Sequence, residues 1–238
     1  MGAADCRFVV LGIIEAHSTL YTGMPIPLAA RLRDATRHLH AEVERAGIMQ
    51  RLLRGAVSRA AYAALLRNLH ALYVPLEDGL SRHAGHPGLA PVADVRLYRS
   101  RALADDLALL HGPCWADDIG LTPAARQYAD HLRRLADAEP AALAAHAYVR
   151  YLGDLSGGQV LARVVATALG LAAGEGVGFY DFGSADDVGR LAQAFRAGLD
   201  GLAGDEAGAQ ALVDEACAAF ERHRQLFEQV ARVTPAAA

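Results

Sequence analysis

Lysine is missing from this sequence: all 23 residues counted as lysine or arginine are arginine. Chemistry that needs a lysine amine is therefore excluded, and any anion site must use guanidinium groups. Charged residues make up 21% of the chain and the formal net charge is −4. Because there is no global basic excess, nucleic acid is not an expected partner.

Cysteine is scarce and long apolar runs are missing. Cys6, Cys114 and Cys217 lie far apart with no CxxC spacing, which fits neither a zinc cluster nor a disulfide framework. This usage suits a reducing compartment, so we expect a cytoplasmic protein. No run of about 18 apolar residues exists, so the sequence predicts no membrane-spanning segment and no membrane partner.

The first residues lack the pattern of a secretory signal. A short apolar core runs from Phe8 to Ile14, with only Arg7 before it and no convincing A-x-A cleavage site. A weak signal peptide is one interpretation; an upstream extension, with the true start at Met24, is the one we favour. We expect residues 1–27 to be a poorly ordered N-terminal extension, 28–233 to form the domain, and 234–238 to be a short tail.

Apolar residues recur at helical spacing, and strand-like alternation is nearly absent. Ser58 is suited to cap a helix, and Thr122–Pro123 combines a cap with proline at the first helical position. We predict helices over 28–46, from 58 towards a loop at 85–91, from 100 to before 112, from 122, from after 140 to 170, over 186–202 and over 205–233. The fold class is all-α, a single-domain helical bundle.

The first predicted helix presents a candidate ligand face. Arg33, Arg37 and Glu44 share a side with His40, since residues three, four and seven apart align on a helix. Glu44 is placed to receive the proton on one ring nitrogen of His40, which leaves the other free for a metal. For this segment alone, a partly buried histidine with solvated arginines is the favoured alternative.

A second predicted helix is interrupted by glycines at 153, 157 and 158. Each interior glycine costs a helix about 1 kcal/mol relative to alanine. Gly153 and Gly157 share a face, where either another helix or a flat ligand could approach closely, the latter with a kink at Gly157–Gly158. Asp154 lies beside this face, where a carboxylate could hold water. For the spacing alone, helix packing is favoured.

The same segment contains Leu155-Ser-Gly-Gly-Gln159, the signature of ABC-type ATPases. Those proteins also need a phosphate loop that ends in Gly-Lys-Ser/Thr. This chain has no lysine, no such loop and no α/β alternation, so the ATPase interpretation fails.

The motifs resemble those of heme oxygenases. The run Arg150–Gln159 looks like the distal-helix signature of that family, and Asp34–His40 resembles its proximal helix. Further matching segments follow in the expected order; they are Tyr73–Glu77, Gly112–Trp115 and Gln225–Glu228. The resemblance covers about 28–233.

This resemblance implies a heme held between the proximal and distal helices. His40 falls at the iron-ligand position, and Glu44 at the position that orients it. Gly153 and Gly157 match the glycines that let the backbone approach heme, and Asp154 matches the carboxylate that organises distal water. Tyr73 and Arg150 belong to the same network. The other expected heme-binding residues are Arg33, Arg37, Tyr148 and Arg196, near the propionates, together with Gly158 and Phe220.

Two positions depart from the pattern. Ala192 stands where some relatives carry a basic propionate partner, and His223 where some carry a neutral amide. These changes put the seating of heme, and hence which meso bridge is cut, in doubt.

The implied function is oxidative cleavage of heme to biliverdin, Fe²⁺ and CO. Heme b would be both substrate and cofactor, and O₂ and an electron donor, a ferredoxin or flavin reductase, would be the partners of a monomer. One alternative is a heme carrier or sensor that does not degrade its ligand. Another is the same fold with different chemistry, such as thiamin breakdown, but that class relies on a catalytic cysteine and the three cysteines lie outside the proximal-helix and distal-helix motifs.

Overall fold

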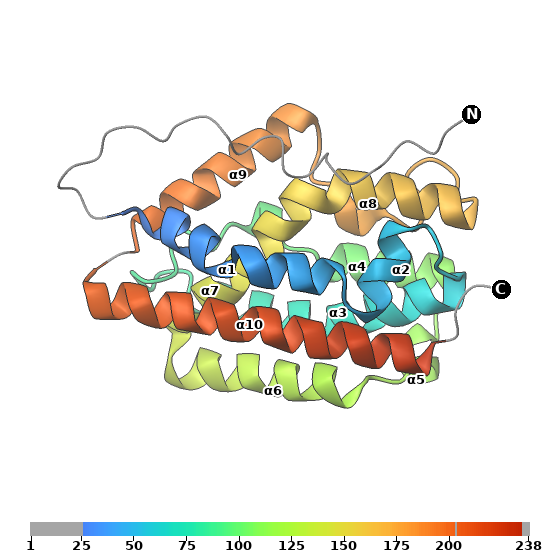
Figure 1. The fold of residues 1–238 in the computed structure, drawn as a ribbon, viewed down its shortest axis with the longest axis horizontal. Coiled ribbons are helices and arrows are strands. Elements are labelled where there is room, and N and C mark those ends of the chain that lie inside the picture. The colour runs from blue at the N-terminus through green and yellow to red at the C-terminus, as the bar shows by residue number, and fades with distance from the viewer. Residues whose placement is uncertain (1–25, 203, 235–238) are drawn as a thin grey trace.

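The computed structural model describes residues 26–202 and 204–234, and the regular structure in these ranges is entirely helical (Figure 1). The expected extension and tail lie almost wholly outside the described residues. The α-helices are α1 (Leu28–Glu44), α2 (Gly47–Leu53), α3 (Arg59–Arg82), α4 (Ser100–Leu110), α5 (Trp115–Asp118), α6 (Pro123–Ala138), α7 (Leu143–Ala147), α8 (Gly153–Leu169), α9 (Ala185–Asp200) and α10 (Glu206–Val233). A π-helical segment, η4 (Tyr148–Leu152), joins α7 to α8, and short 3-10 turns occur at Val95–Leu97, Pro140–Ala142 and Gly178–Tyr180.

The caps read from the sequence are confirmed. The Ser58 hydroxyl accepts from the backbone N–H of Ala61 at 3.2 Å, and the Thr122 hydroxyl accepts from that of Ala125 at 3.2 Å. Each bond satisfies a backbone donor that has no partner inside its helix. Gly170 ends α8 in the left-handed conformation, as expected for a C-terminal glycine.

The helix α10 runs along the length of the molecule and organises the bundle (Figure 1). It packs against α1, α2, α6 and α7, while α3 packs against α4 and α6. The first helix contributes Leu28 and Leu32 to the core, which confirms the predicted apolar stripe. None of the helices in 26–202 and 204–234 is long and apolar enough to cross a membrane.

The sequence pattern placed the end of the first helix at 46 and gave no sign of α2. In the structure α1 ends at Glu44, and the chain turns sharply at Gly47, whose φ is +47°. A Cβ atom at Gly47 would lie 2.3 Å from the carbonyl oxygen of Phe227, so only glycine fits this approach to α10. The boundary depends on a contact made 180 residues later in the chain, which local periodicity does not report.

Candidate active site

The backbone of the distal segment departs from a regular α-helix, as expected. The irregular turn ends five residues before Gly157, where the kink was expected. Residues 148–152 form a π-helical turn, whereas the backbone at Gly157–Gly158 is α-helical within α8. A π turn holds an extra residue and so redirects the side chains around it, and such turns recur at functional sites. This turn carries Tyr148 and Arg150, both expected site residues.

Gly153 and Gly157 expose their backbone to open space. A Cβ atom built on either glycine would meet no described atom within 4 Å outside its own helix. Another helix of the described chain therefore does not pack here, and the helix-packing interpretation of the glycine spacing is wrong. The bared face leaves room for a ligand.

Gly158 differs from its two neighbours. Its backbone faces Tyr180, and a Cβ atom there would lie 3.4 Å from that ring. The small residue therefore serves packing between α8 and the turn at Gly178–Tyr180. Its expected contact with heme stays a prediction.

Asp154, Arg150 and Tyr73 form a buried hydrogen-bonded group. Arg150 donates to Oδ1 of Asp154 at 2.6 Å and, through Nε, to the Tyr73 hydroxyl at 2.9 Å. The Tyr73 hydroxyl in turn donates to Oδ2 of Asp154. The sequence placed all three in one network, and the structure brings them together from α3, η4 and α8.

Burial sets the electrostatics of this group. It raises the pKa of Asp154, while the charge of Arg150 and the hydrogen bond from Tyr73 oppose the rise. Burial also raises the pKa of Tyr73 well above its ordinary value, so this hydroxyl stays protonated and remains a donor. For Arg150, burial alone would lower the pKa, but the charge of Asp154 and the interactions with Tyr73 together outweigh it, so the pKa is raised and the guanidinium stays charged.

His223 borders the same group from α10. Its Nδ1 lies 2.8 Å from the carbonyl oxygen of Ala219 and so carries the ring proton, while its buried Nε2 has no partner among the described residues. Burial, together with the charge of Arg150, holds the pKa of His223 well below its ordinary value. The ring is therefore neutral, and Nε2 presents an unused lone pair.

His40 lies on the accessible side of α1. Its side chain is 47% exposed, and Nδ1 is 3.7 Å from a carboxylate oxygen of Glu44, one turn later. The ring makes an edge contact with buried Phe220 of α10, with centroids 6.0 Å apart. His40 and Glu44 therefore lie close together as expected, but at more than hydrogen-bonding distance, so the donation of the ring proton to Glu44 stays a prediction.

The expected propionate partners on α1 are exposed and paired with a neighbouring carboxylate. Arg33 and Arg37 both donate to Asp34, at 3.1 and 3.0 Å. Burial raises the pKa of Tyr148, while the hydrogen bond with Thr36 and the charges of Arg33 and Arg196 oppose the rise. Exposed pairs such as Arg33–Asp34 are weak, so these arginines can turn towards a ligand.

One connecting residue escaped the sequence analysis. Thr36 is buried on α1, and its hydroxyl contacts the Tyr148 hydroxyl at 3.0 Å and donates to the Leu32 carbonyl at 2.7 Å. This contact ties the proximal helix to the turn that begins the distal segment. The sequence did offer one sign of this role, because Thr36 is a polar residue on the apolar side of α1.

The residues present fit heme. An accessible imidazole is oriented by a carboxylate, a helix face is bared by two glycines, a buried acid lies beside that face, and arginines are close by for propionates. Open space beside Gly153 and Gly157 is the observation that supports this fit most directly.

Comparisons with known proteins agree with this fit. Residues 26–229 match the family model described as "Heme oxygenase". The chain is 36% identical over 203 residues to a protein of Nostoc sp. named "Heme oxygenase 1", covering 85% of each chain. It is 38% identical over 209 residues to the human protein named "Heme oxygenase 1", covering 87% of this chain and 73% of the relative.

A solved structure shares the architecture. The crystal structure of heme oxygenase-2 from Synechocystis sp. in complex with heme and NO superposes with a TM-score of 0.83 at 37% sequence identity. The match covers 86% of this chain and 85% of the other.

Proposed function

The chain belongs to the heme oxygenase family, and from this premise we propose that it degrades heme to biliverdin, Fe²⁺ and CO at the site described above. The observation that carries the proposal is the bared face at Gly153 and Gly157 beside the buried carboxylate of Asp154. A protein that only carries heme needs an iron ligand and propionate partners, but has no use for an acid beside a glycine face.

We propose that His40 would hold the iron of heme b. Its exposure makes the ring available, and the nearby carboxylate of Glu44 favours the tautomer with the proton on Nδ1. Neutral Nε2 is then the ligating atom. Phe220 limits the rotation of the ring by its edge contact.

We assign the propionates to the basic group at the start of α1. Arg33 and Arg37 would leave their exposed ion pairs with Asp34 and pair with the propionate carboxylates. A guanidinium can bind a carboxylate through two parallel hydrogen bonds. Arg196 would add charge from α9, and the Tyr148 hydroxyl, held by Thr36, would add a donor.

Heme supplies the iron that activates O₂ with external electrons, and its own porphyrin ring is the substrate. The residues of the chain have two tasks around it. Gly153 and Gly157 would let the α8 backbone come close to the heme, which would limit by sterics the space open to O₂ beside the ring. Asp154 holds water by hydrogen bonds, so that protons arrive through a water and not from an acid in direct contact.

The partners of Asp154 keep it in place for this task. Arg150 and Tyr73 each hold one carboxylate oxygen, so that the side chain cannot turn towards the heme face. The unpartnered Nε2 of His223 is suited to accept a hydrogen bond from a water of the same network. His223 would thus replace the amide found in some relatives as an acceptor.

The remaining partners are also proposals. Ring opening consumes O₂ and electrons, and we expect a ferredoxin or a flavin reductase to deliver the electrons to a monomer in the cytoplasm. The widely spaced cysteines support a reducing compartment.

Aerobic turnover tests the proposed function. The protein is loaded with heme and given a reductant, and the products are separated by chromatography. We expect loss of the heme absorption and formation of biliverdin. Heme absorption that persists through reduction and aeration would favour a carrier and overturn the proposal.

A further inference from the structure

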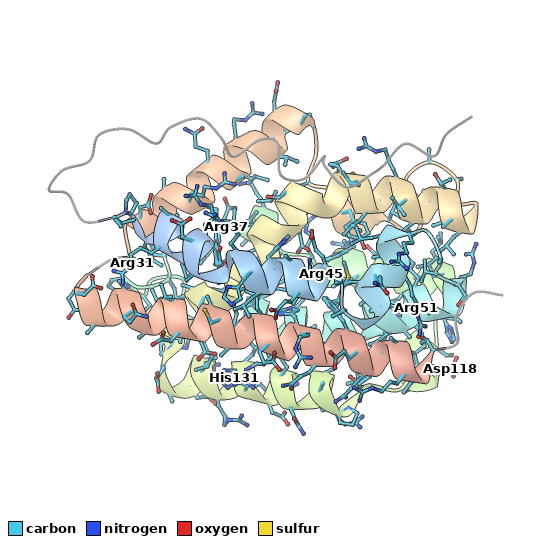
Figure 2. All side chains as sticks on the ribbon, viewed as in Figure 1. Arg31, Arg37, Arg45, Arg51, Asp118 and His131 are labelled. Carbon is cyan, nitrogen blue, oxygen red and sulfur yellow. The ribbon has the colours of Figure 1, made fainter. Side chains whose placement is uncertain are left out.

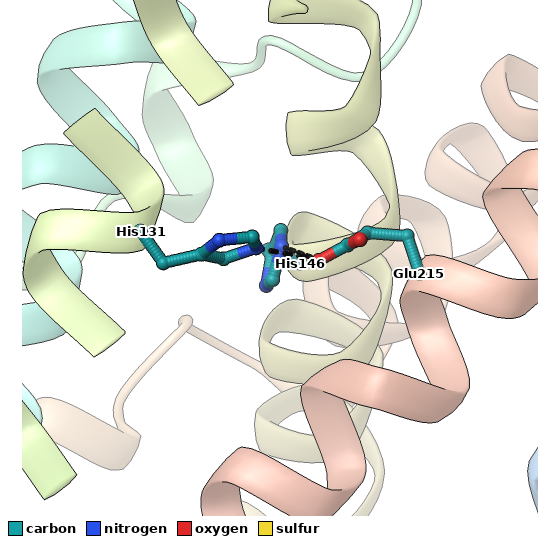
Figure 3. Close-up of side chains that lie close together, drawn as sticks. All are labelled: His131, His146 and Glu215. Carbon is teal, nitrogen blue, oxygen red and sulfur yellow. Dashed lines mark hydrogen bonds and ion pairs between the residues drawn. The ribbon is translucent and has the colours of Figure 1, made fainter. Parts of the chain in front are cut away.

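Outside the heme site, three side chains that can bind a metal ion come together from three different helices (Figure 3). His131 comes from α6, His146 from α7 and Glu215 from α10. One carboxylate oxygen of Glu215 lies 2.7 Å from Nε2 of His131 and 2.9 Å from Nε2 of His146. The three ligand atoms lie within 4.8 Å of one another, and no other such group occurs in 26–202 and 204–234.

The cluster lies at the edge of the bundle and is open on one side. The His146 side chain is 1% exposed, while those of His131 and Glu215 are 15% and 22% exposed. His131 projects from α6 where this helix borders α10 (Figure 2). An ion would therefore be anchored at the buried His146 and reached from solvent past His131 and Glu215.

Tyr128 completes the arrangement behind His146. Its hydroxyl lies 2.8 Å from Nδ1 of that ring. A histidine that binds a metal through Nε2 must carry its proton on Nδ1, and a partner for this proton fixes both the tautomer and the ring orientation. The Tyr128 hydroxyl can accept that proton, so the outer nitrogen of the proposed ligand already has its partner.

We propose that His131, His146 and Glu215 form a binding site for a first-row divalent metal ion, with Zn²⁺ the best match. Two imidazoles and one carboxylate are a recurrent set of zinc ligands, and a tetrahedral ion would take water in the fourth position. The partial exposure of the cluster leaves that position accessible.

The adjustment needed to admit the ion is small. Ligand bonds of about 2.0–2.2 Å in a tetrahedral site separate neighbouring ligand atoms by roughly 3.4 Å. The two nitrogen-to-oxygen distances, 2.7 and 2.9 Å, must therefore grow by roughly 0.5–0.7 Å. Glu215 is partly exposed on a flexible side chain, and its second oxygen makes no hydrogen bond to a described residue, so its carboxylate can move by this amount.

Metal binding would join three helices that are far apart in sequence. His131 and Glu215 are separated by 84 residues. An ion that binds the folded but not the unfolded chain raises stability in proportion to the logarithm of its concentration. We therefore expect the midpoint of thermal unfolding to rise as Zn²⁺ is added.

Titration of the metal-free, heme-free full chain with ZnCl₂ tests the site. Calorimetry, in competition with a chromogenic chelator, should give one bound ion per chain, and Co²⁺ in its place should show the visible absorption of a tetrahedral site. His131→Gln and Glu215→Gln should each weaken Zn²⁺ binding at least tenfold and reduce the rise in the unfolding midpoint at a given Zn²⁺ concentration. Glutamine is chosen because it keeps a hydrogen-bonding group at each position.

The matched control is His111→Gln, which removes a histidine whose Nε2 lies 3.1 Å from Asp118 but which has no third ligand. Its Zn²⁺ affinity should equal that of the parent. Absence of stoichiometric binding in the parent would overturn the proposal, as would one-to-one binding that both cluster variants retain. If Glu215→Gln fails to fold, His131→Gln, at a partly exposed position, tests the site on its own. One-to-one binding retained by that variant would then overturn the proposal.

Discussion

The carboxylate of Asp154 and the guanidinium of Arg150 are paired at 2.6 Å across one helical turn, with only 6% and 14% of their side chains exposed. The pair spans the junction between the π turn and α8, so the irregular backbone brings the two charges together. A buried charge without a partner is unfavourable by several kcal/mol, which explains why neither side chain occurs here alone. The site therefore contains an acid whose position is fixed before any ligand arrives.

Asp154→Asn should separate heme binding from heme turnover. The amide keeps the size of the side chain but can no longer hold or relay a proton as the carboxylate does. We expect heme affinity within a few-fold of the parent and biliverdin formation lowered by about 100-fold, within the range typical of proton-transfer groups. Asp137→Asn, which breaks an exposed pair with Arg82, is the control and should turn over normally. An unchanged biliverdin yield in Asp154→Asn would exclude the proposed role in the water network.

Gly157→Leu should block heme without harming the fold. The new side chain would enter space that is open in the structure, so the helix should remain folded while heme affinity falls by at least about tenfold, a loss of about 1.4 kcal/mol. Spectral titration with heme measures the affinity, and circular dichroism checks the fold. Thr167→Leu, at an exposed position of the same helix, is the control. Equal affinities in the two variants would place heme elsewhere.

Two alanine substitutions should have opposite effects on stability. At Gly153 a methyl group meets no described atom, so alanine should raise the free energy of unfolding of the heme-free chain by about 0.5–1 kcal/mol. At Gly198 the same methyl group would lie 2.1 Å from the carbonyl oxygen of Pro91, so alanine should lower it. Urea unfolding measures both. A loss of stability in Gly153→Ala would show that this face is packed and not open.

Helical spacing predicted which residues share a helix face, and the resemblance to heme oxygenases predicted that these faces hold heme. His40 and Glu44 are one turn apart in α1, and a regular helix brings such a pair together whatever the rest of the fold does. The caps at Ser58 and Thr122 depend on bonds to residues only three positions away and were equally visible.

The parts that were missed depend on contacts between distant segments. His131, His146 and Glu215 belong to three helices, and only the packing of α6 and α7 against α10 brings them together. The end of α1 is set by the approach of Gly47 to Phe227. Neither leaves a periodic signal, because the partner residues are separated by tens to hundreds of positions in the chain.

His70 should make the fold sensitive to mild acid. Burial, with the charge of Arg67, lowers the pKa of His70 from 6.5 to about 4 in the folded chain. Between these values the unfolded chain binds a proton that the folded chain does not, so the free energy of unfolding falls as the pH falls from 6.5 towards 4. One proton gives a slope of at most about 1.4 kcal/mol per pH unit, and less for a half-buried ring.

His70→Asn should reduce this slope. Urea unfolding at several pH values between 7 and 4.5 measures it for the parent, for the variant and for His38→Asn, a control on the exposed side of α1. The slope should become shallower in His70→Asn alone. Three parallel curves would contradict the prediction.

The account depends most on the assignment of His40 as the iron ligand, and a comparison of His40→Ala with His38→Ala tests it most directly. Both histidines are exposed on α1, but only His40 pairs with Glu44 and contacts Phe220. The measurement is the absorption spectrum of each heme complex, followed by biliverdin yield under O₂ and a reductant. We expect His38→Ala to match the parent, and His40→Ala to lose the imidazole-ligated spectrum and to form no biliverdin above the protein-free control. Biliverdin formation by His40→Ala at the parent rate would contradict the assignment.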